Sequence, residues 1–338
     1  MNDRPMHDSA AIDARRRASD AALPAQRRVL VILNPAAGQR RRGLVEATLA
    51  ALRAGGCDLT LKPTGGPGHA ADLAGAARSG ACDVVVAAGG DGTVNEVING
   101  LLAAKGSVPL PPLAILPLGT ANVLAAEIGQ AITPAAIAKT VAEGAPQSIC
   151  LGRASFHDAT AKDKGGPRER VFVMMAGAGF DAHVVEHVNL GLKRLIGKGA
   201  YVWESARQLA CFGFPRYRVT IDGKAHDAAS VIIANGRHYG GRYVVAPEAQ
   251  LADPCLYALL FERGGRLATL RYGAALVGDR LPYLPDVRLV AAREIVIEGP
   301  AGDPVQGDGD LLARLPVRVS LLPEALRLVM PPVRNRGR

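Results

Sequence analysis

Residues 84–100 read VVVAAGGDGTVNEVING, and this stretch decides the fold of the first half of the chain. Its small and apolar start is typical of a buried strand, its Gly-Gly-Asp-Gly centre of a tight turn, and its end of an amphipathic helix. Glycines at such a turn let backbone N–H groups approach a phosphate without a Cβ in the way. The stretch therefore predicts a strand, a turn and a helix that can bind a phosphate group.

The same alternation of strands and helices continues on both sides of this unit. Strands alternating with helices of this length predict βαβ units and a doubly wound parallel sheet. The predicted strands cover residues 28–35, 58–64, 83–90 and 112–119. The predicted helices cover residues 43–56, 69–80, 93–106, 120–129 and 134–144.

The second half has a different pattern. From about residue 148, short apolar segments that alternate with polar residues are separated by Gly, Pro and Asp. This is typical of a half-buried antiparallel sheet, so we expect a β-rich domain over residues 148–321, interrupted by one helix near 199–211. Residues 27–147 form the expected α/β domain, and residues 1–26 are expected to be a disordered basic tail.

Composition narrows the class of protein. A chain of 338 residues suits two compact units, and a net charge of +9 favours an anionic partner such as a nucleotide, a nucleic acid or an acidic membrane surface. The five cysteines form no C-x-x-C pair, which indicates a reducing cytosol rather than a disulfide framework or zinc site.

Membrane contact is expected to be peripheral. The longest run without charge, residues 106–126, contains four prolines, so it does not predict a spanning helix. The N-terminal residues lack the apolar segment of a signal peptide. Basic residues beside aromatic ones in residues 191–214 suit a membrane interface, although a helix packed on the domain core explains them equally well.

Three predicted strand ends share one chemistry. They read NPAAG (34–38), GGDGT (89–93) and LGTAN (118–122). In open α/β sheets, ligands bind beyond the carboxyl ends of strands, where loops meet helix N-termini. Thr93 and Glu96 have the spacing of a capping box, which predicts a well-defined start for the helix after the second loop.

Asp91 is the unusual member of these loops. A carboxylate 4 Å from a phosphate near a protein surface repels it by roughly 4 kcal/mol unless a cation lies between them. We therefore predict that Asp91 holds Mg²⁺, directly or through water, and the alternative is an aspartate that favours a turn. The chain has no Walker A motif, no G-x-G-x-x-G after the first strand, no protein-kinase motifs and no G-x-S-x-G elbow.

With these motifs in order, the chain resembles the diacylglycerol kinase catalytic domain family, which includes bacterial lipid kinases and sphingosine and ceramide kinases and is distantly related to NAD kinases. NPAAG, GGDGTVNEVINGL and LAILPLGTANVLAAEIG carry the resemblance. It continues through MMAGAGFDAHVV, IIANGRHYGGRYVVAPEAQLADPCLYALLF and VQGDGD, and covers nearly all of residues 28–331.

The resemblance implies an NAD-kinase-like α/β domain, a C-terminal antiparallel β-sandwich, and ATP with Mg²⁺ in the cleft between them. It also implies that the last strand, near residues 322–331, returns to the first domain. The residues that it assigns to ATP are Asn34, Pro35, Gly38, Thr64, Gly89, Gly90, Asp91, Gly92, Thr93, Asn95, Glu96, Gly119, Thr120 and Asn122.

The resemblance also assigns the remaining candidate residues. Asp310 occupies the family's glutamate position and is the expected base that takes a proton from the lipid hydroxyl, with Asp308 as the alternative and Asp91 as a catalytic partner. A structural metal in the second domain would bind Asp253 and carbonyl groups of Gln250 and Cys255. Pro254 stands there in place of the family's glycine, and Val123 replaces a common acid after the GTAN loop.

The predicted function is phosphorylation of a membrane lipid hydroxyl by ATP, with diacylglycerol as the default acceptor and a sphingoid base or ceramide as the closest alternative. An NAD kinase and a nucleotide-binding regulator without catalysis stay open as further alternatives. The expected partners are ATP, the lipid and an anionic membrane surface, with no nucleic acid, and a homodimer is left open. The expected location is the cytoplasm, peripherally at the inner face of the membrane.

Overall fold

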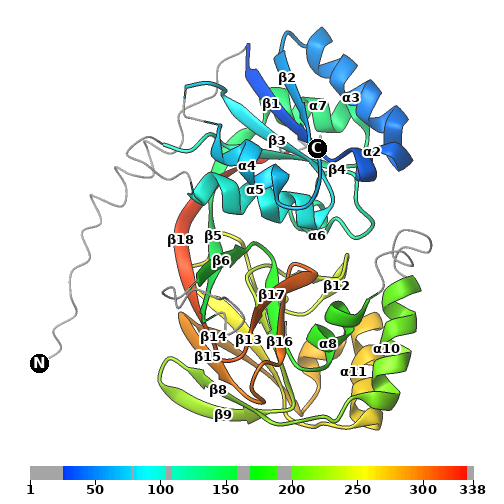
Figure 1. Cartoon of the computed structure of the whole chain (residues 1–338), viewed down its shortest axis with the longest axis vertical. Coiled ribbons are helices and arrows are strands. Elements are labelled where there is room, and N and C mark those ends of the chain that lie inside the picture. The colour runs from blue at the N-terminus through cyan, green and yellow to red at the C-terminus, as the bar shows by residue number, and fades with distance from the viewer. Residues whose placement is uncertain (1–25, 78–79, 104–108, 158–167, 189–198, 333–338) are drawn as a thin grey trace, which may run out of the picture.

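The computed structural model describes residues 26–77, 80–103, 109–157, 168–188 and 199–332 (Figure 1). The predicted N-terminal tail lies outside these residues, apart from Gln26, and so do Lys193, Arg194 and Lys198 of the predicted membrane segment. Two units lie one above the other in Figure 1, joined by two long strands along one side.

The first unit is built on a parallel sheet. Its strands β1 (Arg28–Leu33), β2 (Asp58–Pro63), β3 (Val84–Gly89) and β4 (Leu113–Pro117) lie in the order β2-β1-β3-β4. All residues of β3 and β4 are buried, as in a sheet covered on both faces. The prediction of a doubly wound parallel sheet is confirmed.

Helices cover both faces of this sheet. The helices of this unit are α2 (Pro35–Gly38), η1 (Gln39–Arg41), α3 (Arg42–Ala54), α4 (His69–Gly75), α5 (Asp91–Ala103), α6 (Val123–Glu127) and α7 (Pro134–Glu143). Leu52 of α3 and Ile137 of α7 share one buried cluster with alternate residues of the strands. Ala70 of α4 and Ile98 of α5 belong to the cluster on the other face.

Two long strands connect the units. β5 (Ala145–Phe156) and β18 (Val317–Met330) pair antiparallel along their whole lengths, with a register shift between Leu322 and Leu326. β18 pairs with β4 in the first unit and with β15 (Glu294–Glu298) in the second. The sheet continues through β8 (Tyr217–Ile221) and β9 (Lys224–Ala228), and β6 (Arg168–Phe172) pairs with β5.

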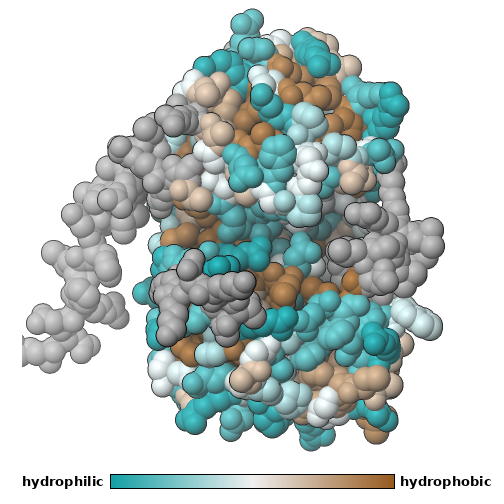
Figure 2. Space-filling view, in the orientation of Figure 1, coloured by the Kyte–Doolittle hydropathy of each residue, from teal (hydrophilic) through white to brown (hydrophobic). Residues whose placement is uncertain are grey.

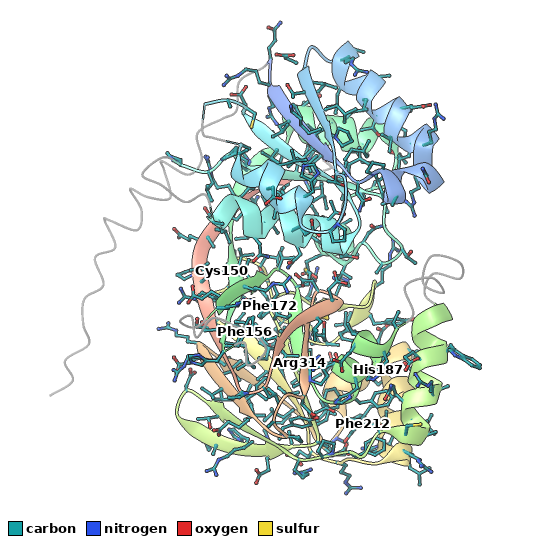
Figure 3. All side chains as sticks on the ribbon, viewed as in Figure 1. Cys150, Phe156, Phe172, His187, Phe212 and Arg314 are labelled. Atoms are coloured by element: carbon teal, nitrogen blue, oxygen red, sulfur yellow. The ribbon has the colours of Figure 1, made fainter. Side chains whose placement is uncertain are left out.

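The second unit is an antiparallel β-sandwich, as predicted. Its other sheet runs in the order β14 (Val287–Ala292), β13 (Leu256–Phe261), β10 (Ser230–Ala234), β7 (Met175–Ala178), β16 (Pro304–Gly307) and β17 (Asp310–Arg314). Phe172 lies in the core between the two sheets (Figure 3). A Cβ on Gly152 of the neighbouring strand would lie 2.0 Å from the Phe172 ring, so the ring covers a position where only glycine fits.

The remaining elements flank the sandwich. They are α8 (Phe180–His187), α10 (Gly199–Cys211), α11 (Arg266–Val277), η2 (Leu281–Tyr283) and the hairpin β11 (His238–Tyr239)–β12 (Tyr243–Val244). The predicted helix at 199–211 is present, whereas α11 was not predicted. β6 and β7 follow each other closely in the chain and belong to different sheets.

The outer surface of both units is mainly hydrophilic in the view of Figure 2, and hydrophobic residues reach the surface in the crevice between them. No helix among the described residues is long and apolar enough to cross a membrane.

Candidate active site

The three predicted loops meet at the carboxyl edge of the parallel sheet. Asn34 caps α2, since its side-chain oxygen accepts hydrogen bonds from the amides of Ala36 and Ala37. Its Nδ2 donates to Oγ1 of Thr93 at 3.0 Å. Pro35 and Gly38 begin and end this helix. The hydrogen bond from Asn34 to Thr93 therefore joins the loop after β1 directly to the turn after β3.

The glycines of the second and third loops are required by close packing. A Cβ on Gly119 would lie 2.6 Å from Cα of Gly90, and a Cβ on Gly89 would lie 2.4 Å from the Thr93 side chain. Larger residues at either place would separate the loops. The two turns therefore form one continuous backbone surface at the end of β3 and β4.

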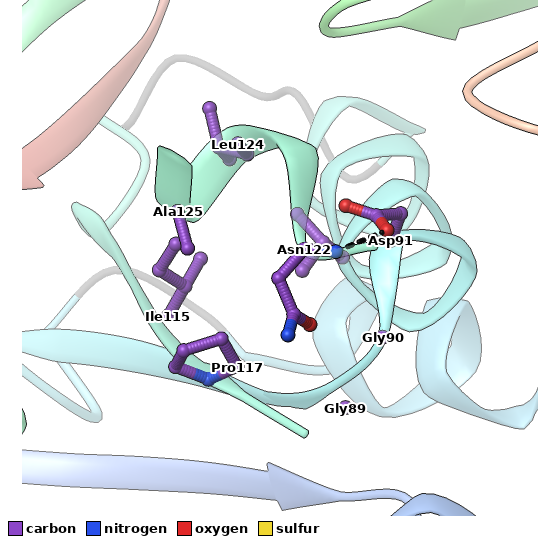
Figure 4. A pocket seen from close by; sticks show the side chains of 9 residues that line it. Gly89, Gly90, Asp91, Ile115, Pro117, Asn122, Leu124 and Ala125 are labelled. Carbon is purple, nitrogen blue, oxygen red and sulfur yellow. Dashed lines mark hydrogen bonds between the residues drawn. The ribbon is translucent and has the colours of Figure 1, made fainter. Parts of the chain in front are cut away.

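Asp91 fixes the third loop to the second (Figure 4). Its two carboxylate oxygens accept hydrogen bonds from the amides of Asn122 and Val123, at 2.9 and 2.7 Å, at the start of α6. Burial raises the pKa of Asp91, and these backbone donors oppose the rise. Asp91 thus caps α6 in this structure, and its binding of Mg²⁺ stays a prediction.

Two polar groups near Asp91 fit a bound nucleotide and its cation. Oδ1 of Asn122 is buried and has no hydrogen-bond partner in the described part of the chain, so it is an open acceptor there. The first amides of α5 have no acceptor within their own helix, and the positive end of the helix dipole favours a phosphate there. The residues present therefore suit ATP with a divalent cation.

The predicted capping box is wrong. α5 begins at Asp91, two residues before the predicted cap at Thr93. The Thr93 hydroxyl accepts from Asn34, and Oε2 of Glu96 accepts the amide of Ala70 in α4 at 3.3 Å. Both side chains therefore hold neighbouring segments against α5 instead of capping each other's amides.

Asp308 connects the second unit to the first. Its oxygens accept the amides of Val173, Met174 and Met175 at 2.8, 2.8 and 3.1 Å, and Nδ2 of Asn95 at 2.8 Å. Burial raises the pKa of this carboxyl group, and the four donors oppose the rise. Asp308 therefore holds the loop 307–310 in place, with both oxygens engaged.

α5 also docks on β6 through an asparagine that the sequence analysis did not select. The amide of Val171 donates to Oδ1 of Asn99 at 3.0 Å, and Nδ2 of Asn99 donates to the Val171 carbonyl at 3.1 Å. Nδ2 of Asn95 donates to the same carbonyl at 3.0 Å. The N-x-x-x-N spacing of Asn95 and Asn99 on one helix face was the available sequence signal.

Asp310 lies over the glycine turn. It is exposed at the start of β17, and a Cβ on Gly92 would lie 2.7 Å from its Oδ2. Within the described part of the chain, the Asp310 carboxylate has no hydrogen-bond or ion-pair partner. The second unit thus places a free carboxylate next to the turn of the first unit.

A groove of about 460 Å³ runs between the units beside these loops. Thr120, Ala121 and Asn122 line it from the first unit, together with Arg41. The β11–β12 hairpin and the end of α11 line the other side, through Gly241, Arg242, Tyr243, Val277 and Asp279.

Thr64, another residue that the resemblance assigns to ATP, is not among the residues that line this groove. It follows β2, where its amide donates to the carbonyl of Leu33.

Glu127 anchors the hairpin wall of this groove. Its Oε2 accepts the amides of Arg237 and His238, both at 3.1 Å, and contacts Nδ1 of His238 at 2.5 Å. Glu127 ends α6, so this link joins the third loop's helix to the second unit. The sequence analysis did not find it, because the two partners lie 110 residues apart.

The predicted structural metal loop is closed by its own hydrogen bonds. Oδ2 of Asp253 accepts the amide of Gln250 at 2.9 Å and the hydroxyl of Tyr257 at 3.2 Å. The carbonyl of Gln250 accepts the amide of Asp253. Cys255 is half-buried beside this turn. The turn is thus maintained by protein donors, and a metal at this place stays a prediction.

Comparisons with known proteins agree with this architecture. Residues 28–154 match the diacylglycerol kinase catalytic domain, and residues 174–330 match the YegS C-terminal NAD kinase beta sandwich-like domain. A diacylglycerol kinase of Mycobacterium tuberculosis is 29% identical over 310 residues, which are 90% of this chain and 95% of that protein. A probable lipid kinase YegS-like of Pseudomonas putida is 30% identical over 298 residues, 85% of this chain and 90% of that one.

A solved structure is also similar. The crystal structure of a putative diacylglycerol kinase from Bacillus anthracis superposes with a TM-score of 0.71 at 25% identity, covering 92% of this chain and 98% of that one. Glycine loops on an α/β unit, facing a β-sandwich, define a kinase with the NAD-kinase-like fold. Within that class, the chain belongs to the diacylglycerol kinase catalytic domain family of lipid kinases.

Proposed function

We propose that this kinase transfers the γ-phosphoryl group of ATP to the hydroxyl group of a membrane lipid, with diacylglycerol as the acceptor. The observation that carries the proposal is the free carboxylate of Asp310 over Gly92. Phosphoryl transfer to an alcohol needs a bound phosphate chain and a carboxylate near the attacking hydroxyl. The glycine turn and Asp310 supply these two parts from opposite units.

Each part has a distinct role in this proposal. The amides of the turn at Gly90–Gly92 and the start of α5 bind phosphate oxygens. Asp310 accepts the proton of the lipid hydroxyl group. The hydroxyl oxygen of the lipid attacks the γ-phosphorus of ATP, and ADP leaves. Asp308 and Asn95 position Asp310, because they fix the loop that carries it. A bound Mg²⁺ would neutralise phosphate charge, with Asp91 and Oδ1 of Asn122 as its nearest protein groups.

The groove and the similar proteins both support a lipid as the acceptor. The groove between the units is large enough for part of a lipid, and Ala126, Ile132 and Val277 are apolar members of a lining that also contains charged and polar side chains. The relative from Mycobacterium tuberculosis is named a diacylglycerol kinase. A sphingoid base or ceramide stays the rival acceptor. Because ATP is supplied in the cytoplasm, the kinase would meet its lipid at the inner face of the membrane.

The test is a panel of acceptors. The full chain is incubated with labelled ATP, Mg²⁺ and mixed micelles containing diacylglycerol, monoacylglycerol, sphinganine or ceramide. We expect labelled phosphatidic acid as the main product. A labelled sphinganine or ceramide product would reassign the acceptor, and ATP binding with no labelled lipid in any arm would contradict the kinase proposal.

A further inference from the structure

The α11 helix exposes apolar side chains on its outer face. Leu267, Leu270 and Val277 are 84%, 56% and 67% exposed, while Tyr272 on the opposite face is buried. A helix at the surface of a water-soluble domain normally turns its polar residues outward. At 100° per residue, Leu267, Leu270, Ala274 and Val277 form one continuous stripe, which we call the α11 stripe.

Arginines lie on both sides of this stripe. Arg266 and Arg271 flank it by helix geometry, and α11 contains no acidic residue. Arg266 donates to the carbonyl of Ala210 at the end of α10, and Arg271 pairs with Asp286 beneath the helix. Both guanidinium groups are therefore held at the edges of the stripe. Exposed apolar side chains beside arginines suit contact with a membrane interface, where long basic side chains lie along apolar surface and keep their charged ends in water.

Two other features accompany the α11 stripe. α10 lies beside α11 in Figure 1, and its Trp203 is 65% exposed, an aromatic residue of the kind enriched at membrane interfaces. At the other end, Val277 also lines the groove between the units. One end of the α11 stripe therefore lies at the groove.

We propose that the α11 stripe, together with Trp203, docks on the surface of a bilayer that contains anionic lipid and delivers the acceptor to the groove. This assignment of the partner rests on the proposed function. The helix has 12 residues, or about 18 Å, so it lies in the plane of the interface and does not span the bilayer. One stripe of four side chains is also much smaller than the 20–30 residues per side of a standard protein interface.

The test compares vesicle binding of three proteins. The full chain, the double variant Leu267→Ser/Leu270→Ser and the control variant Leu61→Ser are floated with vesicles of phosphatidylcholine, with and without phosphatidylglycerol. Leu61 is a matched control because it is an exposed leucine on β2 of the first unit. Circular dichroism verifies that each variant is folded.

We expect binding to vesicles that contain phosphatidylglycerol, about a tenfold weaker partition for the double variant, and no change for the control. Equal partition of the double variant and the parent chain would overturn the inference. A change in oligomeric mass of the double variant by light scattering, with vesicle binding unchanged, would also overturn it and identify an interface between copies.

Vesicle binding is measured without ATP, so it fails or succeeds independently of the kinase proposal. If the panel of acceptors yields no product but the double variant still loses vesicle binding, the proposed function fails and the docking surface stands. Where activity is present, the double variant should phosphorylate long-chain diacylglycerol in vesicles about tenfold more slowly and a soluble dihexanoyl acceptor at the parent rate. Equal slowing on both acceptors would contradict docking.

Discussion

Asp308 and Asp310 are two residues apart and have opposite surroundings. The oxygens of Asp308 accept four hydrogen bonds from Val173, Met174, Met175 and Asn95. Asp310 is exposed, and its Oδ2 lies over Gly92. The first carboxylate maintains the loop, whereas the second has no hydrogen-bond partner among the described residues.

This difference predicts different effects for two matched substitutions. Asp310→Asn should lower kcat by about 10²–10⁴-fold, because an amide cannot take the proton, while the free energy of unfolding changes little. Asp308→Asn should lower the free energy of unfolding by about 1–3 kcal/mol, because an amide NH₂ group would face backbone donors. Urea unfolding and lipid phosphorylation assays on both variants measure this. Full activity in Asp310→Asn would exclude it as the base.

A third acid, Asp181, is expected to make the free energy of unfolding depend on pH. Burial raises the pKa of Asp181 to about 6, although Gln306 and Tyr239 donate to it. Among the residues that the structure describes, its Oδ1 has no hydrogen-bond partner. Because the folded pKa lies above the unfolded value, its stabilising contribution is complete below about pH 4 and is lost as pH rises through 6.

Asp181→Asn should remove this dependence. The parent chain should lose up to about 3 kcal/mol more unfolding free energy than the variant between pH 4 and pH 7, since one pKa unit corresponds to about 1.4 kcal/mol. Urea unfolding at a series of pH values measures the difference. Parallel stability curves for the two proteins would show that Asp181 does not titrate in this range.

Local sequence predicted which segments form the candidate site and gave no signal for the contacts that hold these segments together. The glycine loops and the acids at 308 and 310 were visible as motifs, because each is contiguous. The roles of Asp91 as a cap of α6 and of Asp308 as a clamp were not visible, because their donors are backbone amides of distant segments. A sequence pattern carries no signal for an amide that any residue type can supply.

At the scale of elements, α5 joins the two units. The helix begins within the glycine loop, and its Asn95 and Asn99, one turn apart, bind Val171 of β6, with Asn95 also binding Asp308. The helix therefore transmits any displacement of the sandwich to the candidate phosphate site. Its alternating strand and helix neighbours were predicted well, because the hydrophobic periods of both are clear.

Removing one asparagine should loosen this junction. Asn99→Ala loses the paired hydrogen bonds to Val171 and should lower the free energy of unfolding by about 1–3 kcal/mol. The control Glu143→Ala, on the exposed end of α7, should change it by less than about 0.5 kcal/mol. Hydrogen exchange should also rise selectively in β6. Uniform exchange across both units would argue against a local junction.

α11 shows why one element escaped prediction. Its segment RLATLRYGAALV places leucines on the outside and a tyrosine inside, so its hydrophobic pattern has no helical period facing the core. The bilayer proposed above would explain why these leucines face outward, because it would cover them. Elements whose apolar side faces an external partner are difficult to assign from periodicity alone.

At the scale of the whole molecule, one strand completes both units. Leu328 and Val329 of β18 are buried in the two clusters that cover the faces of the parallel sheet, and Val317 and Val319 of the same strand are buried in the sandwich core. The sheet is therefore continuous from β2 to β9. This continuity couples the stability of the two halves.

The coupling predicts one cooperative thermal transition. Scanning calorimetry should give a single peak whose calorimetric and van't Hoff enthalpies agree. Leu328→Ala should lower the free energy of unfolding by about 2–5 kcal/mol and move the whole peak to lower temperature. Two resolved peaks, with only one of them shifted by Leu328→Ala, would show that the units unfold separately.

β18 also has a consequence during synthesis. Domains usually fold in order as the ribosome releases them, but here β4 gains its second neighbour only when residues 317–330 have left the exit tunnel. Nascent chains arrested after residue 300 should therefore remain sensitive to protease over residues 28–144, whereas released chains are protected. Protection of that region before β18 emerges would contradict this order. Both units of the kinase therefore need β18 to complete their sheets, and neither unit can reach its final fold on a ribosome that stalls before this strand.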